Sequence, residues 1–198
     1  MNVCTYYSYY EKIGNNASVL EEIPEIPTTW VYCRFKDVVN YYLGKTPPRS
    51  ATEYWGNDIS WVSIADMIDN GVITVTKEKL SSVAAPLFKN KISLRGTLLM
   101  SFKLTVGRVS ILGIDAAHNE AIISIFPYYD VEEKFRNYLF KFLPNIANSG
   151  DSKDAIKGTT LNSSSINNLL IPIPPINEQA QIIVAVDRLN EKIAQLSQ

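Results

Sequence analysis

Three carboxylates and a lysine have the spacing of a metal-dependent nuclease site. Asp115 is followed by Glu132, Glu133 and Lys134, and the pattern Asp…Glu-x-Lys would place a metal-binding carboxylate pair beside a lysine. The two glutamates also come shortly after Pro127, at the expected start of a helix, where acidic side chains are stabilised by the helix dipole. We prefer this structural interpretation, expect no metal site, and keep the nuclease as a rival function.

Other catalytic chemistry finds little support in the sequence. His118 is the only histidine, no serine or cysteine motif surrounds it, and it is better explained as the residue before a turn at Asn119. Cys4 and Cys33 have no neighbours at metal-ligand spacing, so we interpret both as free thiols. The chain has neither a methyltransferase Asn-Pro-Pro-Tyr or Asp-Pro-Pro-Tyr motif nor a Walker-type phosphate loop. We therefore expect a non-catalytic protein that needs no cofactor.

Side chains that suit contact with double-stranded DNA occur in three candidate loops. Base edges are read by donors and acceptors in fixed geometry, and phosphates are held by cations. The first loop is stiffened by Pro47 and Pro48, the second is a turn at Gly107, and the third is a polar stretch at residues 145–158. The candidate DNA-binding residues are Lys45, Thr46, Arg49, Ser50, Lys103, Thr105, Lys153, Lys157 and Thr159. For each loop, the alternative is an ordinary exposed turn.

The net charge of −1 conceals a segregation of charge along the chain. Residues 30–110 carry eleven basic and six acidic side chains, whereas residues 1–29 and 111–198 each have a net charge of −3. This distribution suits a domain that holds phosphates with its first lobe and protein partners elsewhere. Trp30, Trp55 and Trp61 could also stack on the bases of a single strand, although packing within the fold is the simpler expectation.

The predicted fold class is α+β, with a mixed, twisted β-sheet. Segments rich in β-branched residues and punctuated by glycine predict the central strands at residues 97–102, 106–112 and 121–126. Further strands are expected at 31–35, 59–64 and 73–75, and a short helix at 36–43, ended by Gly44. At 131–143, Phe135, Tyr138, Leu139 and Phe142 recur at helical spacing and indicate a core helix.

A C-terminal helix is expected to begin at Asn177, after Pro174 and Pro175. Its apolar residues recur at intervals of four and three, as in a coiled coil: Ile182, Val186, Leu189, Ile193 and Leu196. This seam predicts a partner helix, although a helix that packs on its own domain would show a similar period over so few heptads. We divide the chain into a linker or leader at 1–27, a recognition domain at 28–175 and the helix at 176–198. With no signal peptide or membrane-length apolar segment, a cytoplasmic location is expected.

Several motifs, taken in order, resemble the target-recognition domain of type I restriction-modification specificity subunits. They are IPTTWV (26–31), GKTP (44–47), EYWGNDISWV (53–62), LLMSFKLTVGRV (98–109), NEAI (119–122), GTT (158–160), LIPIPP (170–175) and EQ (178–179). The resemblance covers roughly residues 24–198 and rests on the order and spacing of the motifs.

The resemblance implies sequence-specific recognition of double-stranded DNA on behalf of separate methyltransferase and restriction subunits. Members of the family carry two recognition domains held apart by two long helices. This chain has one recognition domain and, at its C-terminal end, one helix of the kind that separates the two domains, so it resembles half a subunit or a fragment. Its expected partners include a second recognition domain or a second copy of the chain. The rival functions are the nuclease and a protein-interaction module that acts through the C-terminal helix.

Overall fold

The computed structural model describes residues 9–13, 16–20, 23–149 and 161–196. Its strands are β1 (Tyr9–Ile13), β2 (Asn16–Leu20), β3 (Val31–Arg34), β4 (Val39–Leu43), β5 (Trp55–Val62), β6 (Gly71–Ile73), β7 (Glu78–Leu80), β8 (Leu98–Ser101), β9 (Val109–Leu112), β10 (Ala117–His118), β11 (Ile122–Pro127) and β12 (Leu170–Ile173). Its α-helices are α1 (Phe35–Val38), α2 (Lys134–Ser149), α3 (Ser163–Asn168) and α4 (Ile176–Leu196). Short 3₁₀ helices lie at Thr52–Tyr54, Ile64–Asp66, Ser82–Phe88 and Val131–Glu133.

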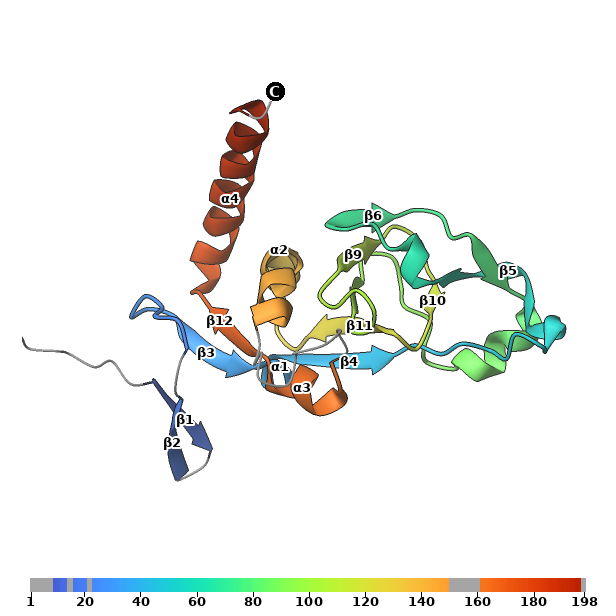
Figure 1. Ribbon diagram of the computed structural model, residues 1–198, viewed down its shortest axis with the longest axis horizontal. Helices are drawn as coiled ribbons and strands as arrows, with labels where there is room; N and C mark the ends of the chain where they lie inside the picture. The colour runs from blue at the N-terminus through green and yellow to red at the C-terminus, as the bar shows by residue number, and fades with distance from the viewer. Residues whose placement is uncertain (1–8, 14–15, 21–22, 150–160, 197–198) are drawn as a thin grey trace, which may run out of the picture.

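A five-stranded sheet in the order β4-β11-β8-β9-β6 forms the centre of the molecule. Its pairs are antiparallel except β6 with β9, which is parallel, so the predicted mixed sheet and the α+β class are confirmed. A smaller sheet, β10-β5-β7, lies toward one end of the long axis, and α4 lies toward the other (Figure 1). The pair β3 and β12 joins the start of the domain to the segment that leads into α4.

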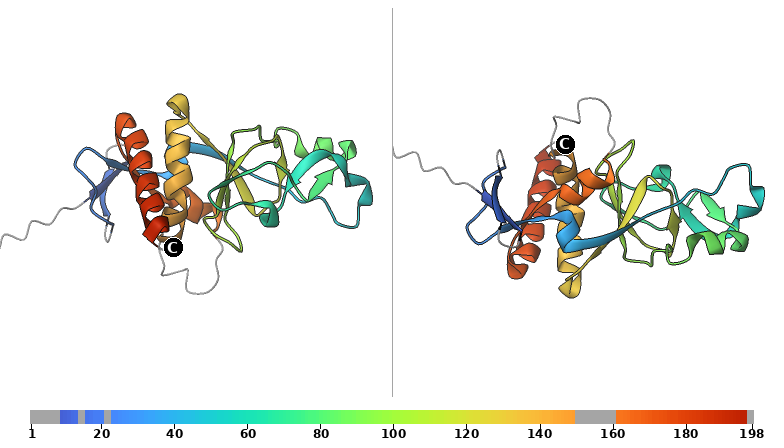
Figure 2. Two further views of the ribbon diagram at one scale, coloured as in Figure 1. Left: turned by 90° about the horizontal axis from the view of Figure 1, so that it is seen from above. Right: turned by 90° about the horizontal axis from the view of Figure 1, so that it is seen from below.

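The central strands are buried on both faces, which explains their high content of branched apolar residues. Leu98 and Met100 of β8 pack in a core with α2, α3 and β12, whereas Leu99, which points to the opposite face, packs with residues such as Val62 and Ile73. The predicted helical stripe is confirmed as core, because Phe135, Tyr138 and Leu139 of α2 are buried and Phe142 packs against them. Figure 2 shows α4 beside α2 in both views, in agreement with the contacts between them.

The helix predicted at residues 36–43 is wrong. Only Phe35–Val38 is helical, and Val39–Leu43 forms β4, an edge strand paired antiparallel with β11. Tyr41 then packs against the main core, while the exposed Tyr42 lies against Phe126 with ring centroids 5.5 Å apart. Alternation across the sheet and the pairing with β11 outweigh the weak helix preference of this segment.

Other boundaries also differ from the expectation: the strands expected at 59–64, 73–75 and 106–112 are observed as β5, β6 and β9, shifted by two to four residues at one end or both. The segment predicted to be a linker contains the β1–β2 hairpin. The polar stretch predicted as a loop from residue 145 is helical as far as Ser149, since α2 continues through Pro144. The last helix begins at Ile176, and the backbone N–H groups of Glu178 and Gln179 donate to the carbonyl of Pro175, so Asn177 is not its N-cap.

Candidate nucleic-acid interface

Two of the candidate loops emerge at the same end of the central sheet. β4 ends at Leu43, which pairs with Ile123 of β11, and β8 ends at Ser101, which pairs with Ile122. The backbone N–H groups of Gly44 and Phe102 then donate to carbonyls at the start of β11, at 3.2 Å and 3.0 Å. Strand register therefore places the Lys45–Thr46 segment and the Lys103–Thr105 turn at one end of the sheet.

The loop at residues 44–50 is anchored through its backbone. The N–H of Lys45 donates to the carbonyl of His118 at 2.8 Å, and the indole Nε1–H of the buried Trp61 donates to the carbonyl of Lys45 at 3.0 Å. The Lys45 side chain is exposed, whereas Pro47 is buried. The exposed ammonium of Lys45 is thus carried by backbone that is already hydrogen-bonded, which would lower the entropy cost of binding an anionic ligand.

Acidic side chains engage two of the predicted DNA-binding residues. Thr46 Oγ1 donates a hydrogen bond to Glu120, and Arg49 forms an ion pair with Glu78. The hydrogen bond that Arg49 donates to Glu78 raises the pKa of Arg49 above its ordinary value, which keeps the guanidinium charged. Ser50, the fourth candidate of the loop, is exposed.

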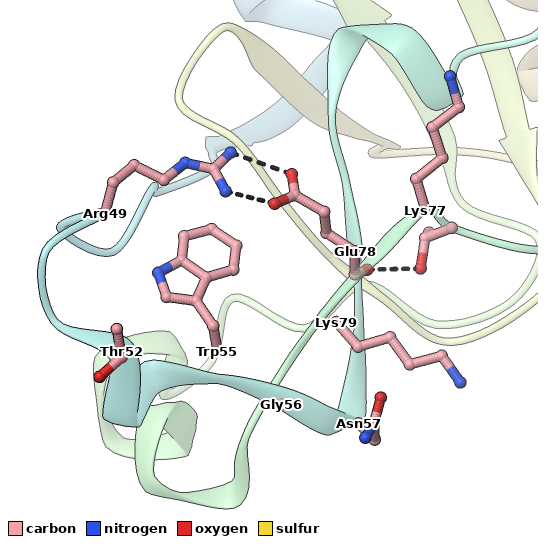
Figure 3. A pocket seen from close by; sticks show the side chains of 9 residues that line it. Arg49, Thr52, Trp55, Gly56, Asn57, Lys77, Glu78 and Lys79 are labelled. Carbon is pink, nitrogen blue, oxygen red and sulfur yellow. Dashed lines mark hydrogen bonds and ion pairs between the residues drawn. The ribbon is translucent and has the colours of Figure 1, made fainter.

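Arg49 also lies over an aromatic ring. Its guanidinium carbon is 4.0 Å from the centroid of Trp55, and Trp55 in turn meets Trp61 edge-to-face at 5.2 Å. A surface pocket of about 450 Å³ lies here, lined by Arg49, Thr52, Trp55, Gly56, Asn57, Thr76, Lys77, Glu78 and Lys79 (Figure 3). The sequence raised Trp55 only as a possible stacking residue for bases, and its contact with Arg49 was not predicted. The contribution of Glu78 was not predicted either, because the alternation Lys77-Glu78-Lys79 is typical of many exposed strands.

The second loop holds its two candidates differently. The Lys103 ammonium lies 5.5 Å from the centroid of the Phe102 ring, and its side chain is half-buried. Thr105 is turned toward Ser101, whose hydroxyl donates to the Thr105 carbonyl and lies 3.2 Å from Thr105 Oγ1. Between them Leu104, at a positive φ of 66°, is 75% exposed at the tip of the turn. The three remaining candidates, Lys153, Lys157 and Thr159, lie outside the described residues and stay predictions.

The carboxylates of the nuclease pattern have structural partners. Glu132 pairs with Lys134 at 2.7 Å, an interaction that lowers the pKa of Glu132, and Glu133 pairs with Arg136 at 2.7 Å. Asp115 accepts a hydrogen bond from the backbone N–H of Arg95 at 2.7 Å. Within residues 23–149 and 161–196, no group of three or more His, Cys, Asp or Glu side chains could hold a metal ion.

His118 is buried against the backbone rather than set in a catalytic site. Its side chain is 1% exposed, and burial lowers its pKa from 6.5 to about 4. The predicted turn at Asn119 is confirmed, since Asn119 Oδ1 accepts a hydrogen bond from the N–H of Ala121 at 2.9 Å. His118 therefore supports this turn as a neutral imidazole.

The family profile of the type I restriction modification DNA specificity domain matches residues 27–198. The chain belongs to this family. The match starts near the expected domain boundary and includes both loops at the end of the central sheet, together with β12 and α4.

Two proteins similar to this chain in sequence are specificity subunits of type I restriction enzymes. The type I restriction enzyme MjaIX specificity subunit of Methanocaldococcus jannaschii is 27% identical over 185 residues, which cover 87% of this chain and 40% of that protein. The type I restriction enzyme HindI specificity subunit of Haemophilus influenzae is 30% identical over 153 residues, covering 75% of this chain and 33% of that protein. The chain thus spans well under half the length of these relatives.

Solved structures show the same fold. The HsdS subunit from Thermoanaerobacter tengcongensis matches with a TM-score of 0.63 at 21% identity, over 89% of this chain and 41% of that one. The type I restriction-modification S subunit from M. genitalium matches with a TM-score of 0.55 at 12% identity, over 90% and 43% of the two chains.

In the specificity domain, α4 is held by one face. Ile183 packs against the main core, Asp187 pairs with Lys141 of α2 at 2.5 Å, and Glu178 accepts a hydrogen bond from the indole N–H of Trp30 at 3.0 Å. The predicted seam follows a neighbouring face. Its first two residues, Ile182 and Val186, are half-buried, whereas Leu189, Ile193 and Leu196 are 58%, 61% and 88% exposed. Of the helices in the described part of the chain, none is long and apolar enough to cross a membrane.

Proposed function

We propose that this chain reads a short sequence of double-stranded DNA as the specificity subunit, or half of it, of a type I restriction-modification complex. The observation that carries the proposal is the gathering of the Lys45–Thr46 segment and the Lys103–Thr105 turn at one end of the sheet in a member of this family. Recognition needs side chains that both neutralise phosphates and reach base edges, and these loops supply both kinds. We assign recognition to residues 28–175.

The partners we propose are DNA, the methyltransferase and restriction subunits of the complex, and a second recognition domain. That domain would be another part of a longer protein or a second copy of this chain. The helix at 176–198 would supply the contact, since its three exposed seam residues continue beyond the part covered by the domain. Each large apolar side chain buried by a partner helix would contribute about 1.5–3 kcal/mol. Because its substrate is DNA, the complex would act in the cytoplasm.

The chain itself would be non-catalytic and would need no cofactor. The carboxylates of the nuclease pattern are engaged with Lys134, Arg136 and the backbone of Arg95. Methylation and cleavage would therefore come from the partner subunits. Metal-dependent cleavage by protein free of contaminating nuclease, abolished by Glu132→Ala, would favour the nuclease instead.

A selection experiment tests the proposed function. The chain, alone and with the methyltransferase subunit, would be incubated with duplexes of randomised central sequence, and bound molecules would be recovered by gel shift and sequenced. We expect a reproducible short motif to be enriched. Equal recovery of all sequences would contradict sequence recognition. Binding of the methyltransferase without any effect on DNA binding would favour the protein-interaction module.

A further inference from the structure

The ion pair of Arg49 and Glu78 lies in an unusual setting for an exposed pair. Exposed pairs are commonly mobile and contribute little to stability. Here the guanidinium lies 4.0 Å from the centroid of the Trp55 ring, and both of its terminal nitrogens donate to Glu78, one of them at 3.0 Å (Figure 3). The side chains of Arg49 and Glu78 nevertheless remain 57% and 40% exposed. The pair is ordered, and it is accessible to a ligand.

The strands beneath the pair hold both partners in place. Glu78 lies on β7, opposite Trp61 of β5, and the hydroxyl of Thr76 donates to the Glu78 carbonyl at 2.8 Å. The N–H of Lys77 donates to the buried Asp66 at 3.0 Å. Trp55 is fixed by its edge-to-face contact with Trp61. A base-reading site requires this kind of ordering before the ligand arrives.

The hydrogen-bonding capacity of the pair is only partly used. A guanidinium carries five N–H donors, and the two hydrogen bonds to Glu78 use fewer than half of them. Carboxylate oxygens also accept more than one hydrogen bond each. The pair therefore presents donors and an adjacent acceptor to the same approaching ligand.

We propose that Arg49 and Glu78 together read one G·C base pair in the major groove. Arg49 would donate to N7 and O6 of guanine, and Glu78 would accept from the N4 amino group of the paired cytosine. A G·C pair presents two acceptors followed by a donor, which complements this arrangement, whereas an A·T pair places its donor between two acceptors. The proposal rests on the proposed function, because it assumes that the chain binds double-stranded DNA.

The charge of the pair favours a base edge over a phosphate. Arg49 alone would suit a phosphate, but the carboxylate beside it neutralises its charge and would repel a second anion. The exposed Lys77 and Lys79 flank Glu78 in sequence and extend in different directions in Figure 3. Both lysines line the pocket, and we assign a phosphate contact to Lys79, so that Lys79→Gln serves as the control for loss of a positive charge beside the pair.

Selection from duplexes with a randomised centre tests the proposal on the full chain. The wild type should enrich a motif that includes one invariant G·C pair. Arg49→Lys keeps the charge but loses the planar fork, so discrimination at that position should fall by about 10-fold or more while the salt dependence stays the same. Glu78→Gln should admit other pairs at the same position and should not weaken total DNA binding, since it removes a negative charge. Both substitutions are conservative and exposed, and thermal unfolding would verify that the fold is retained.

Lys79→Gln should leave the motif unchanged and reduce the salt slope of binding by about 1. If the wild type selects a motif and both Arg49→Lys and Glu78→Gln retain every base preference in it, the inference is overturned while the proposed function stands. If the wild type selects no motif, the proposed function fails and the inference fails with it.

Discussion

The imidazole of His118 lies against Gly44, so closely that a Cβ on Gly44 would be 2.4 Å from His118 Nδ1 and 2.1 Å from the His118 carbonyl oxygen. Both distances are far below van der Waals contact, and the carbonyl is held by the N–H of Lys45. The passage from β4 into the Lys45–Thr46 segment, the first candidate loop, therefore requires glycine.

Gly44→Ala should destabilise the protein and displace the loop that follows. We expect a loss of about 2 kcal/mol or more in the free energy of unfolding, together with weaker DNA binding, because the clash involves backbone that cannot move aside. Denaturant unfolding and gel shift would measure the two effects. Ser50→Ala, at an exposed position of the same loop, should change stability by less than about 0.5 kcal/mol. Equal stability of Gly44→Ala and the wild type would contradict the close packing.

Burial of His118 should make the protein less stable in mild acid. The pKa falls from 6.5 to about 4 on folding, so between these values the unfolded state binds more protons than the folded state. This contribution is fully present above pH 6.5 and is lost as the pH falls toward 4, by about 3 kcal/mol in total. Unfolding midpoints measured across this range would test it. His118→Gln should remove this part of the pH dependence, and an unchanged profile in the variant would assign it to other groups.

Lys45→Glu should weaken DNA binding and lower the salt slope by about 1, since one fewer counterion would be released. Lys36→Glu makes the same charge change at an exposed position of α1, before β4 begins, and should have little effect. Affinities measured at several salt concentrations would compare the two. Equal losses from Lys45→Glu and Lys36→Glu would place the DNA elsewhere.

Thr46→Ala and Lys103→Ala test for base reading. A substitution at a base-reading residue should relax sequence preference more than it lowers overall affinity.

Asp66 should prove essential to the lobe that carries the Arg49 pocket. Its buried carboxylate accepts hydrogen bonds from the N–H of Ser63 at 2.9 Å, the hydroxyl of Ser63 at 2.6 Å and the N–H of Lys77 at 3.0 Å. Asp66→Ala would leave these donors without an acceptor and should cost about 2 kcal/mol or more. Asp69→Ala, at an exposed site nearby, is the control for loss of one carboxylate. Chemical denaturation that gave equal stabilities for the two variants would show that Asp66 is dispensable.

Assembly through α4 should depend on the seam. Val186 and Leu189 replaced together by Asp should disrupt association with a second copy or with the methyltransferase subunit, while the domain stays folded. Gln181 and Gln195 replaced by Asp introduce the same charge at exposed positions away from the seam and should have no effect. Analytical ultracentrifugation with and without the methyltransferase would compare the variants. Identical assembly of all forms would show that the seam is not an interface.

The sequence by itself determined the elements that depend on local residue patterns: the central strands, the core-facing stripe of α2 and the Pro-stiffened loop. The strands predicted at 97–102 and 121–126 are observed at Leu98–Ser101 and Ile122–Pro127, and the stripe from Phe135 to Leu139 is a core-facing part of α2, as its helical spacing predicted. The Pro-stiffened loop was also predictable, because proline restricts the backbone locally. The strand at Val39–Leu43 was not, since its five residues become a strand by pairing with β11, about 80 positions later in the chain.

Only the tertiary structure decided what the candidate residues can do. Arg49 and Glu78 are 29 positions apart, and they meet because β5 and β7 pair and bring the loop and the edge strand together over Trp55. The same is true of Thr46 and Glu120, which are 74 positions apart. Local patterns carry the backbone preferences of neighbouring residues, whereas a binding site is formed by side chains that strand register brings together from distant segments.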